Sequence, residues 1–225
     1  MITSYAGEVN FDKMMNKLLD EVHSYNRVPA INQMKKREGE YAYRVLISTI
    51  LSSRTKDEVT SRASKKLFLR APNPRTLMQL PENEIIELIY PVGFYRIKAK
   101  NIKEVARILL EKYNGIVPDK LIELTRLPGV GRKTANLVLG IGFNIDAITV
   151  DTHVHRISNR LGIIKTKLPL ETELDLQMIL PRKYWIPFNT YLVLHGQTIC
   201  KPISPICSQC RIASCCQQVG VKRNR

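Results

Sequence analysis

The chain has 225 residues, of which 44% are hydrophobic and 24% are charged, a balance that excludes wholesale disorder and suits one large domain or two small ones. Lys and Arg number 35 against 20 Asp and Glu, so the net charge is +15, which favours a polyanionic partner. No apolar run approaches the roughly 18 residues of a membrane span, and the start of the chain lacks the pattern of a signal peptide; we expect an intracellular protein of the cytoplasm or nucleoid with no membrane partner.

Helical patterns dominate the first half of the chain. Residues 43–52 predict a mostly buried helix, and Thr55 and Glu58 have the spacing of a capping box at the start of the next helix. Pro81 is placed to open a short helix. In 98–113 the apolar residues recur every three or four positions, which predicts a helix that ends at the following Asn-Gly pair.

The second half of the chain also predicts helices. Residues 153–161 carry one apolar stripe and are followed by Gly162, which is suited to a helix C-terminus. Residues 187–196 predict another buried helix. Because no convincing strand pattern or hairpin turn occurs, we expect an all-α protein of about ten short helices.

The positive charge is unevenly distributed. Residues 1–34 carry a net charge of −1, residues 35–145 carry +10, and residues 146–225 carry +6. Nucleic acid is therefore the leading partner; a solvated basic surface is the alternative, and an anionic membrane ranks below both because no basic amphipathic helix with an aromatic face is present.

All five cysteines lie near the end of the chain. Four of them follow the spacing C-x6-C-x2-C-x5-C, namely Cys200, Cys207, Cys210 and Cys216. Four thiolates in one short loop suit Zn²⁺ or an iron–sulfur cluster. Only one CxxC pair is present, whereas zinc sites usually pair two, so the pattern favours a cluster. Cys215 is left over and could replace Cys216 at the last position.

Residues 124–140 contain a glycine-rich corner, "LPGVGRK", between two helical stretches. Gly129 and Gly131 are expected to allow backbone conformations closed to other residues, so that a phosphate can approach the backbone N–H groups. Lys133 follows at the start of a helix, where the helix dipole and the neighbouring Arg132 disfavour the protonated amine. A neutral lysine is a nucleophile that can form a Schiff base, although a lysine that only contacts phosphate is the simpler interpretation.

Asp151 lies between an apolar run and a helical stripe. A helix N-cap is the simplest interpretation of this position, but a carboxylate held there could also assist a nucleophile or stabilise positive charge. His153 and His155 follow, and their spacing does not indicate a metal site on a helix. His195 is interpreted as a structural histidine.

Taken in order, these segments resemble the endonuclease III family of DNA glycosylases, within the helix-hairpin-helix superfamily. The resemblance covers about residues 30–216. It rests on "LPGVGRKTAN", "VDTHVHR", "LHGQTIC" and the cysteine spacing, with support from "LSSRTKD" and "VGFYRIKAKNI".

The resemblance implies a fold of two helical domains with a cleft between them that holds the DNA and the active site. Residues 35–145 would form a six-helix barrel with the helix-hairpin-helix. Residues 1–34 and 146–225 would form a domain in which the four cysteines of the motif bind a 4Fe–4S cluster.

The resemblance also implies an activity in base-excision repair. The enzyme would be a bifunctional DNA N-glycosylase and AP lyase that acts on double-stranded DNA with oxidised or damaged pyrimidines or abasic sites. Lys133 would attack the sugar C1′ of a flipped nucleotide. Asp151 would activate Lys133 or stabilise the electron-poor sugar, and β-elimination would then break the strand. We expect a monomer.

The remaining DNA contacts are implied by the same resemblance. The hairpin would hold backbone phosphates through Leu127, Gly129, Val130, Gly131 and Arg132. The histidines at 153 and 155 are further candidates.

Two expected contacts depart from the family pattern. Arg54 stands where many relatives have Gln filling the gap left by the flipped base. Phe94 stands where relatives often have a Leu wedge, and an aromatic wedge could stack between bases.

Two other functions stay open from the sequence. One is a mismatch-specific glycosylase of the same superfamily, which removes thymine or adenine; Lys133 argues against it. The other is a non-catalytic DNA-binding protein in which four cysteines hold a structural zinc.

Overall fold

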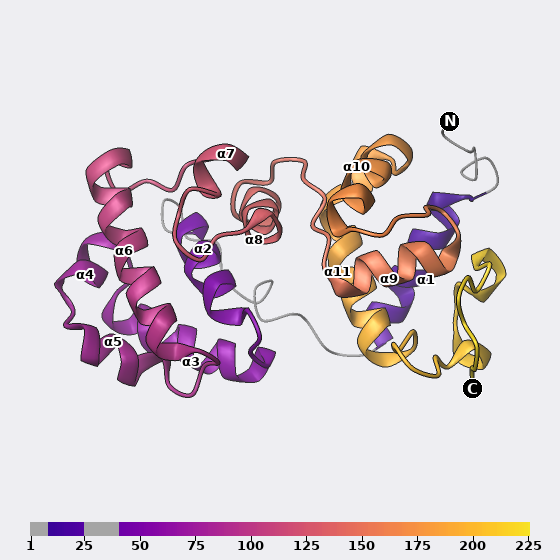
Figure 1. Cartoon of the computed structure of the whole chain (residues 1–225), viewed down its shortest axis with the longest axis horizontal. Coiled ribbons are helices and arrows are strands. Elements are labelled where there is room, and N and C mark those ends of the chain that lie inside the picture. The colour runs from indigo at the N-terminus through magenta and orange to yellow at the C-terminus, as the bar shows by residue number, and fades with distance from the viewer. Residues whose placement is uncertain (1–8, 25–40) are drawn as a thin grey trace. The chain divides into compact units, whose positions relative to one another are not determined.

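The computed structural model describes residues 9–24 and 41–225. Within these ranges the chain forms α-helices with short 3₁₀ and π turns and no β-strand, which confirms the all-α prediction. The described residues fall into two compact units, one of residues 9–24 with Asp146–Arg225 and the other of residues 41–145 (Figure 1). The N-terminal boundary that we predict between residues 34 and 35 lies outside the described residues.

The unit of residues 41–145 is built around one buried helix. Its elements are α2 (Tyr41–Ser52), α3 (Asp57–Arg70), α4 (Pro74–Gln79), α5 (Glu82–Ile89), α6 (Tyr95–Tyr113), α7 (Leu121–Leu124), α8 (Arg132–Leu137) and the π-helical turn η3 (Val138–Gly142). Helix α2 is buried along most of its length and packs against α3, α6, α8 and η3. The long helix α6 ends at Asn114, which adopts a left-handed backbone conformation, as the Asn-Gly pair predicts.

The start of α3 differs from the prediction. The N-cap is Lys56, without a side-chain cap, so the expected capping box of Thr55 and Glu58 is wrong. The hydroxyl of Thr55 instead accepts hydrogen bonds from the backbone N–H of Gly93 and from Lys98, both at 3.1 Å. The hydroxyl of Thr55, which the sequence pattern predicts as a cap of α3, is thus bonded to residues that are distant in the sequence.

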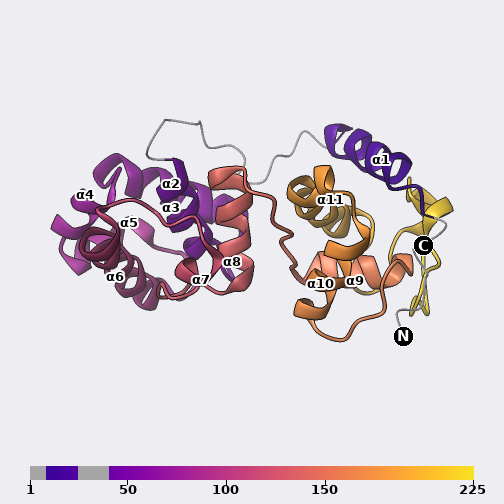
Figure 2. The same ribbon diagram turned by 90° about the horizontal axis from the view of Figure 1, so that it is seen from above.

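The other unit has its own hydrophobic core. Its elements are α1 (Phe11–Ser24), α9 (Thr152–Leu161), α10 (Pro169–Ile179), η4 (Arg182–Tyr184), α11 (Trp185–Thr198), η5 (Cys207–Gln209) and η6 (Ala213–Cys215). Met14 and Leu18 of α1 are fully buried in this core with Val154 and Ile157 of α9 and Phe188 of α11. Helix α1 packs against α11, from the opposite end of the sequence (Figure 2). Among the described residues, no helix combines the length and the apolar character needed to cross a bilayer.

Candidate active site and cysteine centre

The glycine-rich corner forms a tight turn between α7 and α8. Leu127 donates its backbone N–H to the carbonyl of Leu124, and Val130 donates to the carbonyl of Leu127, both at 3.1 Å. Leu127 and Val130 are buried, so their side chains anchor the turn in the core of their unit. Their backbone N–H groups are already bonded within the turn, so contact of Leu127 and Val130 with a phosphate stays a prediction.

The two glycines of the turn have different roles. Gly129 has a φ of +76°, a conformation that favours glycine, and a Cβ there would lie 2.9 Å from the side-chain nitrogen of Asn101, which would have to shift. Gly131 has a φ of −91°, so the expectation of a special backbone conformation at this position is wrong. A Cβ on Gly131 would meet no atom within 4 Å. Its small size leaves open space in front of the first turn of α8.

Lys133 lies in the first turn of α8, two residues after that open space. Its side chain is exposed, as are Gly131 and Arg132. The first N–H groups of a helix have no partner within the helix, and together with the exposed cations they favour an anion. The turn therefore places an accessible amine beside groups that can bind phosphate.

Asp151 caps α9, as one of the two interpretations of the sequence predicts. Its Oδ1 accepts hydrogen bonds from the backbone N–H of His153 at 2.9 Å and of Val154 at 2.8 Å. The segment before it is fixed by Ile148 and Val150, which lie in the core, and by buried Asn189, which donates to the carbonyl of Thr149 at 3.1 Å. The carboxylate is therefore held rigidly and stays partly exposed. Asp151 belongs to the unit that contains residues 146–225, and Lys133 belongs to the unit of residues 41–145.

The two histidines after Asp151 contact protein groups. The Nδ1 of His153 lies 3.1 Å from the guanidinium of Arg156. The Nδ1 of His155 lies 2.7 Å from the hydroxyl of Thr172 on α10. Both side chains are half-buried. These contacts give each histidine a structural role, and contact with DNA stays a prediction.

Arg54 and Phe94 are brought together on the unit of residues 41–145. Both are exposed and both have left-handed backbones, with φ of 51° and 58°. The guanidinium carbon of Arg54 lies 5.7 Å from the centroid of the Phe94 ring, within the range of a cation–π interaction. The two residues that depart from the family pattern thus form one surface feature.

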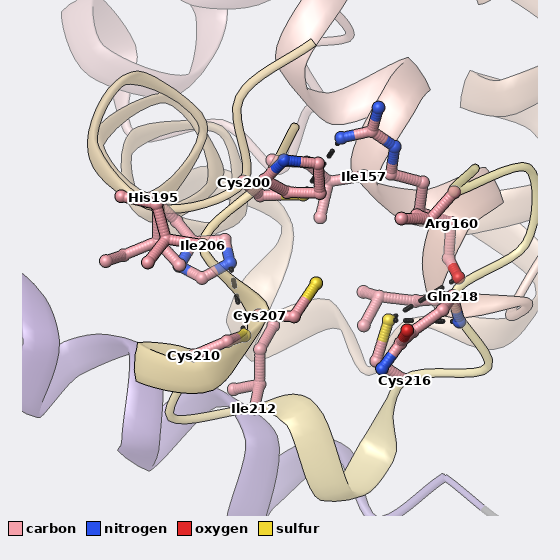
Figure 3. A pocket seen from close by; sticks show the side chains of 14 residues that line it. Ile157, Arg160, His195, Cys200, Ile206, Cys207, Cys210, Ile212, Cys216 and Gln218 are labelled. Atoms are coloured by element: carbon pink, nitrogen blue, oxygen red, sulfur yellow. Dashed lines mark hydrogen bonds between the residues drawn. The ribbon is translucent and has the colours of Figure 1, made fainter. Parts of the chain in front are cut away.

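The four cysteines of the predicted motif line one cavity, which is drawn in Figure 3. Cys200, Cys210 and Cys216 also pack against the hydrophobic core of their unit. Cys215 does not line the cavity, and its sulfur lies 3.8 Å from the hydroxyl of Ser214. As they stand, the side chains of the described residues form no group of three or more potential metal ligands.

Polar groups reach three of these sulfurs. Arg160 donates to Cys200 Sγ at 3.4 Å, and the backbone N–H of Gln218 donates to Cys216 Sγ at 3.4 Å (Figure 3). The Nε2 of His195 lies 3.8 Å from Cys210 Sγ. Such donors stabilise sulfur ligands that carry negative charge.

His195 is buried, and its Nδ1 lies 2.8 Å from Oε1 of Glu21 on α1. Desolvation alone would lower the pKa of His195, but hydrogen bonds with Cys200, Cys210 and Glu21 raise it to about 11. Desolvation would raise the pKa of the Cys200 thiol, but hydrogen bonds with His195 and Arg160 lower it. The structural interpretation of His195 fits this burial, whereas no sequence signal links Glu21 to the cysteines.

Comparison with known proteins defines the class to which this fold and site belong. Residues 47–182 match the family model of the HhH-GPD superfamily of base excision DNA repair proteins. The match includes the hairpin, Lys133, Asp151 and α9, and it ends before the cysteines.

Relatives narrow this class to one family. Endonuclease III of Thermotoga maritima is 53% identical over 175 residues, which cover 78% of this chain and 82% of the relative. Endonuclease III homolog 2, chloroplastic, of Arabidopsis thaliana is 47% identical over 186 residues, or 48% of its length. A solved structure of a trapped endonuclease III–DNA covalent intermediate is 33% identical, with a TM-score of 0.78 over 93% of this chain and 97% of the other. The chain belongs to the endonuclease III family and is a DNA glycosylase and AP lyase of base excision repair.

Proposed function

We propose that Lys133 is the nucleophile of this enzyme and that its substrate is an oxidised or otherwise damaged pyrimidine, or an abasic site, in double-stranded DNA. The proposal rests above all on the exposed position of Lys133 directly after the glycine turn. A lysine that is accessible beside a phosphate-binding backbone can reach the sugar of the same DNA strand.

The amine of Lys133 can carry out both base excision and strand cleavage. Lys133 attacks C1′ of a flipped nucleotide, and the damaged base leaves with the electrons of the glycosidic bond and takes up a proton. The C1′–O4′ bond then breaks, O4′ takes up a proton, and the nitrogen loses one to form the Schiff base. Removal of a proton from C2′ expels the 3′ phosphate, which cleaves the strand.

We assign Asp151 the role of the assisting carboxylate. Its Oδ1 is held by two backbone N–H groups, which fixes the carboxyl group in orientation. An oriented carboxylate can accept the proton of the attacking amine or stabilise the electron-poor sugar. The similarity to a family member solved as a covalent intermediate with DNA supports a covalent mechanism here.

The four cysteines are proposed to bind a 4Fe–4S cluster. The fit rests on four thiols around one cavity, three of them reached by polar groups, and on the exclusion of Cys215 from its lining. When bound, the cluster cross-links the C-terminal loop and can store an electron. None of the proposed proton transfers or bond changes requires it to change oxidation state.

Borohydride trapping tests this function. Wild type should form a covalent complex with duplexes that contain an oxidised pyrimidine or an abasic site, and Lys133→Gln should form none. Lys112→Gln, an exposed lysine near the end of α6, is the matched control and should trap like wild type. Undiminished trapping by Lys133→Gln would move the nucleophile elsewhere. Excision from a thymine mismatch alone would favour the mismatch-specific glycosylase instead.

A further inference from the structure

Lys98 is a buried lysine that the proposed chemistry does not use. It lies on α6, and its side chain reaches the turn that follows α2. The ammonium donates to the carbonyl of Leu51 at 2.8 Å, to the carbonyl of Ser53 at 2.5 Å and to the hydroxyl of Thr55 at 3.1 Å. An ammonium has three N–H donors, so each finds an acceptor.

These contacts join two turns that are distant in the sequence. Thr55 accepts from Lys98 and also from the backbone N–H of Gly93, at 3.1 Å. A Cβ on Gly93 would lie 2.6 Å from the carbonyl oxygen of Arg54, so the two turns touch backbone to backbone. Phe94 follows Gly93 in the sequence, and Arg54 precedes Thr55. Both exposed residues therefore lie next to the contact between the two turns.

The joined turns hold unfavourable conformations. A left-handed backbone is strained for a residue other than glycine, and both Arg54 and Phe94 adopt one. Such conformations persist where surrounding contacts over-determine them. Burial lowers the pKa of Lys98 to about 8, so the ammonium form that makes all three bonds still predominates at pH 7.

We propose that Lys98 is a positioning residue that clamps the Arg54 turn to the Phe94 turn, so that the two exposed side chains act as one rigid probe inserted into DNA at the lesion. This rests on the proposed function, because it assumes that the probe assists extrusion of a damaged nucleotide. Lys98 itself does not touch DNA in this proposal; its three acceptors occupy its donors.

The experiment compares two substrates under single-turnover conditions. A damaged pyrimidine in a duplex requires extrusion, whereas an abasic site in a single strand requires none. Lys98→Met should slow excision from the duplex about tenfold or more and leave cleavage of the single-stranded site within about twofold of wild type. Lys112→Met, exposed on the same helix, should change neither.

Two variants of Thr55 separate the loss of the clamp from a general folding defect. Thr55→Val removes the shared hydroxyl and should show the same loss on the duplex alone, and Thr55→Ser, which keeps the hydroxyl, should restore the wild-type rate. In a Phe94→Ala background, Lys98→Met should cost no more than about a further twofold, because the probe is already lost.

Each outcome decides a different question. Equal losses on both substrates, or full additivity with Phe94→Ala, would overturn the positioning role of Lys98. A wild-type protein that cleaves neither substrate would overturn the proposed function instead. The comparison of the two substrates does not depend on which lysine is the nucleophile.

Discussion

The guanidinium of Arg54 lies over the ring of Phe94, although the two residues lie on separate turns of the chain. Both side chains are exposed, so the pair presents a cation and an aromatic face to the surface together. Aromatic wedges can unstack a base step, and a cation beside the wedge can contact the gap that a flipped nucleotide leaves.

We predict that Phe94→Ala weakens extrusion more than binding. Excision from a damaged duplex should fall by about tenfold, since the wedge acts when the base leaves the stack. Affinity for undamaged duplex should change less than about threefold, because phosphate contacts supply most of it. Stopped-flow fluorescence of a base analogue beside the lesion, with parallel binding titrations, measures both. Equal losses on damaged and undamaged DNA would count against the wedge.

Two substitutions of Asp151 should separate its structural and chemical roles. Asn caps helices about as well as Asp, so Asp151→Asn should keep the melting temperature while excision falls by about a hundredfold or more. Asp151→Ala should lose the cap as well, with a stability cost of about 1 kcal/mol. Thermal unfolding and single-turnover excision distinguish the two. Full activity of Asp151→Asn would leave Asp151 as a cap only.

The two glycines of the hairpin turn offer a matched pair. Gly129→Ala should destabilise the protein by about 1–2 kcal/mol, since alanine is strained at its positive φ and would crowd Asn101. Gly131→Ala should fold normally, because its backbone is ordinary and its Cβ meets nothing.

The same alanine at position 131 would nevertheless enter the space in front of α8. If a phosphate binds there, Gly131→Ala should weaken DNA binding by about fivefold or more, which corresponds to one lost phosphate contact. Titrations at two salt concentrations measure the effect. Unchanged affinity would place the phosphate elsewhere on the protein.

Two adjacent cysteines give a direct test of the proposed cluster site. Cys216→Ser should reduce the iron content of the purified protein and its visible absorbance, because it removes a sulfur that lines the cavity. Cys215→Ser should leave both unchanged. The reverse result would make Cys215 the ligand in place of Cys216. Stoichiometric zinc in the wild-type protein would show a structural zinc site and not an iron–sulfur cluster.

Much of this protein is determined by patterns along the chain. Apolar periodicity predicted α6 and α9, and largely apolar runs predicted α2 and α11 as buried helices. The residue types at helix ends predicted the cap at Asp151 and the stop at Asn114. The motif around Lys133 and the cysteine spacing led to the family. These signals depend on residues within a few positions of one another, so the sequence displays them directly.

Other relationships were decided only by tertiary structure. Thr55 was expected to cap its own helix, but folding brings it to Gly93 and Lys98, which engage its hydroxyl. Likewise, Glu21 meets His195 only because α1 packs against α11. Such contacts depend on which buried faces pack together, and a buried polar group takes whatever partner that packing supplies. The spacing of residues along the chain therefore does not show which partner a buried polar group will meet.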